Sequence, residues 1–309
     1  MINYLKLIRY RHLLLLAFMQ LIFRYGFLKL QNIPLALADW QYILLVFSTL
    51  FLAAGGSIIN AIFQQDSDSE NKPDCQVVGK FISENTAYNL YAAFTFTGVS
   101  IGFYLSNVIQ KSNFAILFIL IASTLYFYAS SMKNSILIGN IIVAFTTSIY
   151  LLLIGLFDLL PTTFEANQTV MGIHFSILFD YAVFTFIIAF LIELVSDIEN
   201  TKGDTSQGLS TLAVVIGFSK AKNTVLTLSL IPILCVVYYL KVYLFDAKLL
   251  YSFIYGLIFI VTPLIYFSIK IFKANEPKEF RHLNIILKCI LFFAYLSIFV
   301  ISLNIQNHA

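Results

Sequence analysis

Residues 174–204 read HFSILFDYAVFTFIIAFLIELVSDIENTKGD, a long apolar run that ends in a group of acidic and amide side chains. The apolar part is close to the roughly 20 residues that a helix needs to cross a bilayer. Carboxylates are costly near hydrocarbon, so a group of them where such a helix emerges points to a partner that requires negative charge, most simply a divalent cation. This stretch therefore predicts a membrane helix with a cation site at one end.

A second stretch of the same kind, residues 60–73, reads NAIFQQDSDSENKP and also follows an apolar run. We call residues 60–73 the first acidic cluster and residues 193–204 the second acidic cluster. Each is followed by a polar loop with Gly and Lys, and together they form a weak internal duplication. Such repeats commonly place the binding site of a membrane protein at the interface between the two halves.

Composition limits the class of protein. Of the 309 residues, 60% are hydrophobic and only 11% are charged, and the mean hydropathy is +0.86. These values exceed what a soluble core requires and are typical of a polytopic membrane protein. The net charge of +3 is small and most basic residues fall between apolar runs, so nucleic-acid binding has no support.

Nine stretches are long enough to cross the bilayer at about 20 residues each. We expect these helices near residues 12–31, 39–63, 86–107, 113–131, 135–157, 174–197, 223–243, 249–270 and 283–303. The predicted fold class is all-α, a polytopic membrane protein with nine transmembrane helices. We expect a single domain over residues 1–309, with loops outside the bilayer near 64–85 and 198–222.

Basic residues give the orientation of these helices. With the N-terminus inside, 13 of the 19 Lys and Arg residues fall in the cytoplasmic tail and loops, as the positive-inside rule requires. The same orientation puts both acidic clusters on the cytoplasmic side, where two distant segments can meet over one cavity. We expect an integral membrane protein of a bacterial or archaeal cell membrane, in contact with the lipid bilayer.

Helical geometry groups the polar side chains of each cluster. At about 100° per residue, four residues of the second acidic cluster fall within about 60° of one another, provided the helix runs on to Gly203. They are Glu193, Asp197, Asn200 and Asp204. In the first acidic cluster a similar stripe comprises Asn60, Gln64 and Asp68. Facing stripes of oxygen ligands suit octahedral Mg²⁺, which accepts a few carboxylates, retained waters and phosphate oxygens.

Basic residues near the two clusters suggest a phosphorylated ligand. Four lysines of the predicted cytoplasmic loops could neutralise the charge that a cation leaves on such a ligand. They are Lys72, Lys80, Lys133 and Lys202. Taken one at a time, all of these polar residues also fit solvated helix ends with ordinary positive-inside lysines. Only the two clusters together favour a binding site.

The chain resembles the UbiA superfamily of intramembrane prenyltransferases, which has two Asp-rich motifs, after its second and sixth helices. The first motif usually reads NDxxDxxxD followed by NKP, and its matches here are Asn60, Asp68, Asn71, Lys72 and Pro73. The second motif is close to ExxxDIEDxxGDxxxGxxTL, and its matches are Glu193, Asp197, Ile198, Glu199, Gly203, Asp204, Gly208, Thr211 and Leu212. The resemblance covers nearly the whole chain. The second motif is most similar to the branch that attaches a geranylgeranyl group to geranylgeranylglyceryl phosphate.

This resemblance implies nine helices around a central cavity and an alkyl-transfer enzyme that releases diphosphate. It implies that the motifs hold Mg²⁺ and an isoprenoid diphosphate, with Asp68, Asp197 and Asp204 as catalytic carboxylates. Further metal ligands would be Asn60, Gln64, Glu193 and Asn200, and Asn60 would bind substrate together with the four lysines. The acceptor would be a membrane-associated lipid or aromatic compound, which places the enzyme in lipid biosynthesis.

Departures from the family pattern keep other functions open. Ala61 and Gln64 stand where the first motif usually has two Asp, and Asn200 replaces a usual Asp of the second. Fewer anionic ligands lower the charge available to Mg²⁺, although amide oxygens still coordinate it. The alternatives are a terpene cyclase on the same scaffold, a catalytically impaired isoprenoid-binding paralogue and a secondary transporter. The transporter ranks last because its polar groups should lie near the midplane rather than at helix ends.

Other charged residues receive an ordinary interpretation. Arg24, near the outer end of the first predicted span, is expected to extend its head group to the interface. Asp158 is interpreted as loop charge on the side opposite to the clusters. Asp180, inside the span that begins at residue 174, is interpreted as a partner of a neighbouring helix or a group at the outer interface.

Overall fold

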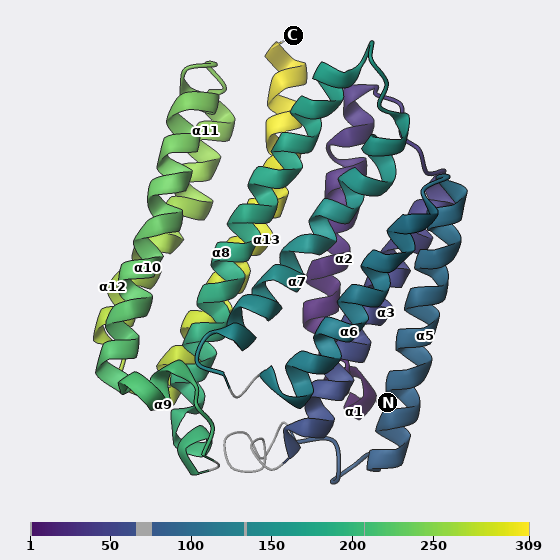
Figure 1. Ribbon diagram of the computed structural model, residues 1–309. Coiled ribbons are helices and arrows are strands. Elements are labelled where there is room, and N and C mark those ends of the chain that lie inside the picture. The colour runs from purple at the N-terminus through teal and green to yellow at the C-terminus, as the bar shows by residue number, and fades with distance from the viewer. Residues whose placement is uncertain (1, 66–75, 133–134, 207, 309) are drawn as a thin grey trace. The chain divides into compact units, whose positions relative to one another are not determined.

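The structure of the protein is a computed structural model that describes residues 2–65, 76–132, 135–206 and 208–308 (Figure 1). Within these ranges it is helical apart from connecting segments and one isolated β-bridge between Val78 and Ile82. The first helices are α1 (Ile2–Leu7), α2 (Tyr10–Tyr25), α3 (Asp39–Phe63), α5 (Glu84–Val108), α6 (Ala115–Ser130) and α7 (Ile138–Ile154). They are followed by α8 (Gln168–Ser206), α9 (Leu212–Ile216), α10 (Phe218–Tyr239), α11 (Leu250–Gly256), α12 (Thr262–Lys273) and α13 (Pro277–His308).

Short segments of other helical types extend several of these helices. The 3₁₀ segments are η1 (Leu28–Gln31), η2 (Ser112–Phe114) and η5 (Leu160–Thr162). The π-helical segments are η4 (Gly155–Leu159), η6 (Leu240–Phe245) and η7 (Leu257–Val261). Because a π turn shifts the hydrogen-bond partner by one residue, it changes which side chains face the protein beyond it. The apolar pattern alone does not predict these segments.

Eight helices among the described residues are long and apolar enough to cross a membrane. They span Tyr10–Gln31, Asp39–Phe63, Ser112–Ser130, Ile138–Thr162, Gln168–Ser206, Phe218–Phe245, Leu250–Lys273 and Pro277–Gln306. Each coincides with a span predicted from the sequence, and the largest difference is at α8, which is longer at both ends. The remaining predicted span coincides with α5, a helix of 25 residues that is less apolar because it carries Asn, Thr and Ser side chains. The chain is thus an all-helical polytopic membrane protein.

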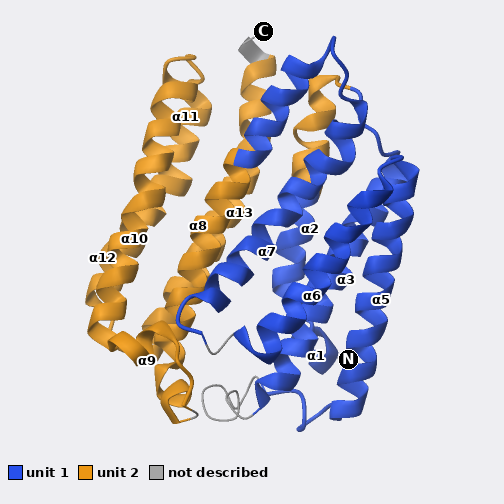
Figure 2. Cartoon of the chain, in the orientation of Figure 1, with its two compact units in different colours: residues 1–20, 34–179 blue, residues 21–33, 180–309 orange. Residues whose placement is uncertain are grey.

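Contacts within the chain divide it into two compact units (Figure 2). Unit 1 comprises Met1–Gln20 and Pro34–Phe179, and unit 2 comprises Leu21–Ile33 and Asp180–Ala309. The division matters for function because the first acidic cluster belongs to unit 1 whereas the second acidic cluster belongs to unit 2.

Unit 1 is built on close packing of α3 against α5 and α6. Ser48 on α3 donates a hydrogen bond of 2.6 Å to the carbonyl oxygen of Gly98 on α5. At Gly102, one turn further along α5, a Cβ atom would overlap the ring of Phe118 on α6. Small residues at such crossings let membrane helices approach closely, which matters because lipid supplies no hydrophobic drive for their association. Near its end, where the first acidic cluster begins, α3 belongs to a buried apolar cluster that includes residues of α5 and α6.

In unit 2, α11 and α12 pack against α13, and α10 packs against α12. Tyr181 on α8 and Ser297 on α13 share a hydrogen bond of 2.6 Å, and Phe23 packs edge-on against Tyr181 with ring centroids 5.0 Å apart. Thr185, one turn further along α8, donates to the hydroxyl of Tyr295 on α13 at 3.2 Å. Such interhelical bonds average about 0.6 kcal/mol in a bilayer, so they orient helices more than they stabilise them. They set the position of α8 beside α13.

Two charged residues differ from their sequence-based interpretation. Asp158 on η4 is fully buried: its carboxylate accepts a hydrogen bond of 3.1 Å from the N–H of Leu37, and its carbonyl accepts one of 3.0 Å from the N–H of Ala36. It therefore ties the segment before α3 to the end of α7, and the interpretation as loop charge is wrong. Arg24 is 1% exposed, so its head group does not extend to the interface as expected. Burial of a charged group requires partners that replace its lost hydration.

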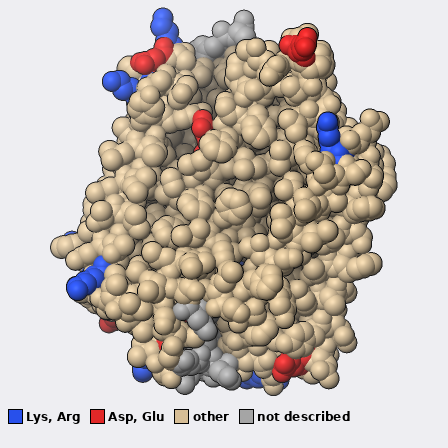
Figure 3. Space-filling model, viewed as in Figure 1, with Lys and Arg blue, Asp and Glu red and all other residues tan. Residues whose placement is uncertain are grey.

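Uncharged residues cover most of the described surface on the face shown in Figure 3, where Lys, Arg, Asp and Glu are sparse. Large apolar side chains are exposed on several helices, among them Phe96 on α5, Leu234 on α10 and Tyr251 on α11. A soluble monomer rarely exposes extensive apolar surface. The surface is therefore the kind that lipid contact requires.

Candidate functional site

The second acidic cluster lies on α8, which continues well beyond its apolar run. The helix extends to Ser206, so Gly203 is helical and the condition for a single polar stripe is met. The residues that share this side of the helix are Glu193, Asp197, Asn200 and Asp204. Asp204 is buried, with 4% of its surface exposed, and the other three are half-buried. Much of the segment expected as a loop near 198–222 is thus helical.

Glycine closes α8 directly after the stripe. The N–H of Leu209 donates to the carbonyl of Asp204 at 2.9 Å and that of Gly208 donates to the carbonyl of Thr205 at 3.2 Å, the two bonds of a Schellman motif. Gly208 has a φ of +66°, a left-handed conformation that a Cβ atom disfavours. The hydroxyl of Thr211 donates to the carboxylate of Asp204 at 3.4 Å. The turn therefore orients Asp204 through both its main chain and its side chain.

One amide oxygen of the same stripe has no partner among the described residues. Asn200 Oδ1 is buried and makes no hydrogen bond there. A buried acceptor without a donor is costly, so such an atom is normally completed by a water, a hydroxyl group or a cation. Carboxylate and amide oxygens are the ligand types that Mg²⁺ uses. The donor set of the stripe therefore fits that ion.

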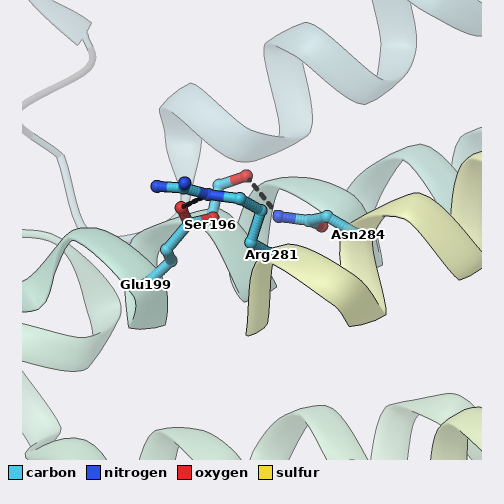
Figure 4. Close-up of polar contacts among 4 residues, drawn as sticks. All are labelled: Ser196, Glu199, Arg281 and Asn284. Carbon is cyan, nitrogen blue, oxygen red and sulfur yellow. Dashed lines mark hydrogen bonds and ion pairs between the residues drawn. The ribbon is translucent and has the colours of Figure 1, made fainter. Parts of the chain in front are cut away.

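A neighbouring face of α8 is bonded to α13 (Figure 4). Arg281 Nε donates to Glu199 Oε1 at 3.1 Å, forming an ion pair, and Asn284 Nδ2 donates to Ser196 Oγ at 3.0 Å. Because each residue advances about 100° around the helix, Ser196 and Glu199 lie to one side of the acidic stripe. Glu199 matches the second motif in sequence, yet its side chain is engaged with α13. The motif thus combines a polar stripe with a helix contact.

The first acidic cluster is described only at its start. Helix α3 ends at Phe63, and Gln64 is the residue that caps it. Asn60 and Gln64 are both buried, and the amide group of Gln64 donates to Asn60 Oδ1. Two residues predicted as metal ligands therefore bond to each other through an oxygen that would coordinate the ion. Asp68 and Lys72 lie outside the described residues.

The loop after the first acidic cluster ends in a tight turn before α5. The N–H of Gly79 donates to the carbonyl of Ile82 at 2.9 Å, and Gly79 has a φ of +79°. A residue with a Cβ atom rarely adopts this conformation, which explains the glycine. Lys80 follows it at the exposed tip, with its Nζ 5.6 Å from the ring centroid of Phe81. The turn leaves the Lys80 amine accessible.

The structure does not bring the remaining predicted site residues together into one complete binding site among the described residues. Lys202 is exposed on α8, and Lys133 lies outside the described residues. Across the described ranges, no group of three or more His, Cys, Asp and Glu side chains is arranged to hold a metal ion. The second acidic cluster nevertheless supplies carboxylates and an unpartnered amide oxygen on one stripe. That both clusters meet over one cavity stays a prediction.

Comparison with known proteins finds relatives of this chain. The model of the UbiA prenyltransferase family matches residues 15–296. A digeranylgeranylglyceryl phosphate synthase from Sulfurisphaera tokodaii is 30% identical over 169 residues, which is 55% of this chain and 55% of that protein. The match therefore spans just over half the length of this curated relative, and the same holds for others of the same name.

Solved structures share the fold over nearly the whole chain. The structure of a digeranylgeranylglyceryl phosphate synthase matches with a TM-score of 0.64 at 22% identity and covers 97% of both chains. A UbiA homolog from Archaeoglobus fulgidus, bound to DMAPP and Mg²⁺, matches with a TM-score of 0.60 at 15% identity and covers 96% of this chain and 99% of that one. At these identities the likeness establishes the fold alone.

Proposed function

Because this chain belongs to the UbiA prenyltransferase family, we propose that it is an intramembrane prenyltransferase acting on an isoprenoid diphosphate. The observation that carries this proposal is the continuation of α8 to Ser206, which puts the carboxylates of Asp197 and Asp204 on one stripe with the unpartnered oxygen of Asn200. An anionic stripe at the end of a membrane helix fits a cation that holds a diphosphate.

Similarity to digeranylgeranylglyceryl phosphate synthases favours one class of acceptor. We infer a prenylated glyceryl phosphate whose free hydroxyl group receives the isoprenyl chain. In this reaction the bond between C1 of the isoprenoid and the diphosphate oxygen breaks, and a bond forms between C1 and the acceptor oxygen. The proton of the hydroxyl group leaves to solvent or to the released diphosphate.

Specific residues would divide the work of binding. Those that would hold Mg²⁺ are Glu193, Asp197, Asn200 and Asp204, with Asn60, Gln64 and Asp68 from the first acidic cluster. Bound there, Mg²⁺ would supply positive charge against the departing diphosphate. The amines of Lys80 and Lys202, both exposed, would pair with the remaining phosphate oxygens, as would Lys72 and Lys133. Thr211 would keep Asp204 in place through its hydroxyl group.

We also propose that α5 is a ninth membrane span. Its 25 residues would extend about 37 Å at 1.5 Å per residue, more than the hydrocarbon thickness. Ser106 donates to the carbonyl of Gly102 at 2.8 Å and Asn107 donates to that of Phe103 at 2.8 Å, so these polar side chains are satisfied within the helix. With the N-terminus inside, nine spans put both acidic clusters on the cytoplasmic side.

A catalytically impaired isoprenoid-binding relative is the second candidate, and one observation favours it. The amide group of Gln64 occupies Asn60 Oδ1, and Ala61 between them offers no ligand. The described start of the first acidic cluster therefore presents no carboxylate, which would weaken Mg²⁺ binding. A terpene cyclase would need the same ionisation of the isoprenoid diphosphate. It would differ only in what captures the allylic carbocation, which is a double bond of the substrate itself rather than an acceptor.

A single assay separates these functions. Purified full-length protein in detergent is given geranylgeranyl diphosphate and Mg²⁺, with and without geranylgeranylglyceryl phosphate. We expect diphosphate release that depends on the acceptor, together with a product that carries a second isoprenyl chain. Release without the acceptor would indicate a cyclase, and binding without release would indicate the impaired relative. The absence of both binding and diphosphate release, with isoprenoid diphosphates of every chain length, would contradict the proposal.

A further inference from the structure

Near its C-terminal end, α8 presents two different faces to its surroundings. One face carries the acidic stripe, and the adjacent face is bonded to α13 through Ser196 and Glu199 (Figure 4). Buried apolar residues such as Val195 and Ile198 pack this part of the 39-residue helix against its neighbours. The bonds to α13 add directional contacts, which constrain the rotation of α8 about its own axis more sharply than apolar packing does.

We propose that Arg281 and Asn284 of α13 are positioning residues for the second acidic cluster. They hold α8 at the rotation at which Asp197 and Asp204 face the ligand, and they act through Glu199 and Ser196 without touching the ligand themselves. The spacing fits this role, because the two bonded residues on each helix are three positions apart and therefore share one face. Two such bonds fix both the rotation and the register of α8 against α13. This inference rests on the proposed function.

The ion pair is anchored on the α8 side. The side chain of Glu199 is 5% exposed, whereas that of Arg281 is 60% exposed. A carboxylate this deeply buried requires a charged partner, and a guanidinium supplies it with a planar and directional set of N–H groups. Without Arg281, Glu199 loses this charged contact, and the face of α8 that carries it is held less firmly against α13. The orientation of the acidic stripe is then less well defined, since both belong to the same helix.

Asn284 adds a second bond between α13 and α8, and it also carries a buried oxygen atom without a partner in the described structure. Its Nδ2 donates to Ser196, while its Oδ1 is buried without a partner in the described structure. Asn200 Oδ1, one turn after Ser196 on α8, is likewise buried without a partner. Two unpartnered acceptors beside one helix contact indicate that a donor or cation completes this region. A phosphate oxygen, itself an acceptor, does not satisfy them, whereas a cation or its coordinated water does.

The experiment compares variants of full-length protein in two assays. The variants are Arg281→Gln, Arg281→Lys, Glu199→Gln, the double variant Arg281→Gln with Glu199→Gln, and Asn284→Ala. Lys278→Gln serves as the matched control, because Lys278 is exposed one turn before Arg281 and its loss removes the same charge. The first assay measures prenyl transfer against Mg²⁺ concentration. The second measures binding of Mn²⁺ in the presence of inorganic diphosphate by electron paramagnetic resonance, with no isoprenoid present.

We expect Arg281→Gln and Glu199→Gln each to raise the half-maximal Mg²⁺ concentration and the Kd for Mn²⁺ by about tenfold, the usual cost of disturbing groups that orient metal ligands. The double variant should be no worse than the worse single variant, since both remove the same contact. Arg281→Lys should recover part of the loss because it keeps the charge. Asn284→Ala should raise both values about threefold, and Lys278→Gln should leave them unchanged.

Three results would overturn the proposal. Arg281→Gln could match Lys278→Gln in both assays, the double variant could show the product of the single effects, or Arg281→Gln could lower only the unfolding temperature. If the Arg281 variants do not fold, the nearly isosteric variant Glu199→Gln tests the proposal by itself in the same two assays. A failure of the proposed function is distinguishable, because the Mn²⁺ assay needs no prenyl transfer. Wild-type protein that binds no Mn²⁺ with diphosphate would overturn both.

Discussion

The two acidic clusters follow apolar helices of the same kind, but their side chains are bonded in different ways. On α8, Thr211 donates to the carboxylate of Asp204, and Arg281 pairs with Glu199. On α3, the described members of the first acidic cluster bond to each other, with the amide of Gln64 on the oxygen of Asn60. The second acidic cluster is thus held by other parts of the chain, whereas the described start of the first is bonded within itself.

This difference suggests that the clusters contribute unequally to the proposed site. Carboxylates already oriented by their neighbours lose little conformational freedom when a cation binds, whereas amides bonded to each other must first separate. Carboxylates also carry the charge that a divalent ion requires. We therefore expect the second acidic cluster to supply most of the affinity for Mg²⁺ and diphosphate, and the first to limit it.

The largest expected effect is an all-or-none difference in cysteine labelling. The experiment tests whether the two clusters lie on one side of the membrane. In a cysteine-free background, single cysteines are introduced by Glu84→Cys, Ser210→Cys and Glu165→Cys. The first two should react with an impermeant maleimide only from the cytoplasmic side, and the third only from the opposite side. Labelling of all three from one side would contradict the nine spans, and labelling of the first two from opposite sides would separate the two clusters.

Loss of a carboxylate from the second acidic cluster should have the next largest effect. Asp197→Ala and Asp204→Ala should each reduce prenyl transfer about 10- to 100-fold, because each removes a charged ligand of the proposed ion. Transfer is measured at equal amounts of inserted protein, and Asp246→Ala serves as the control because Asp246 is an exposed carboxylate beyond η6. Turnover close to wild type in both variants would mean that the metal site lies elsewhere.

Restoring the usual residues of the first motif should have a moderate effect. Ala61→Asp with Gln64→Asp adds two carboxylates and removes the amide that occupies Asn60. A charge-assisted ligand contributes on the order of 1 kcal/mol, so the half-maximal Mg²⁺ concentration should fall about fivefold and transfer should rise. Gln65→Asp, off the stripe, should leave the Mg²⁺ dependence unchanged. A double variant that shows no change, or no activity, would favour the cyclase or the impaired relative.

The smallest expected effect concerns the turn that ends α8. Gly208→Ala puts a Cβ atom on a residue with a φ of +66°, so the free energy of unfolding should fall by about 1 kcal/mol. Gly172, also on α8, has open space where a Cβ would be, and Gly172→Ala should be neutral or stabilising by up to about 1 kcal/mol. Thermal unfolding in detergent compares the two variants. Equal stability would contradict the role of the turn in holding Asp204.

The spans were predictable because apolar length and flanking charge act locally. Helix α3 was predicted at 39–63, and the structure places it at Asp39–Phe63. The predicted stripe on α8 depended only on the helix continuing past Gly203, which it does. In both cases the deciding interactions are between residues a few positions apart, and the sequence carries this information directly.

Interactions between distant residues were not predictable in the same way. Asp158 resembled loop charge until its carboxylate was found on the N–H of Leu37, 121 positions earlier in the chain. Glu199 was recognised as part of a motif, but nothing in its local sequence indicated the ion pair with Arg281. Both bonds depend on which helices become neighbours, and a single sequence carries little information about that choice.

A structure of the protein bound to geranylgeranyl diphosphate and Mg²⁺ tests the central claim most directly. We predict a cation coordinated by Asp197 and Asp204 with the amide oxygen of Asn200, the diphosphate on that cation, and the pair of Glu199 with Arg281 intact. A cation held without any residue of the second acidic cluster, or a diphosphate bound away from the end of α8, would contradict the account.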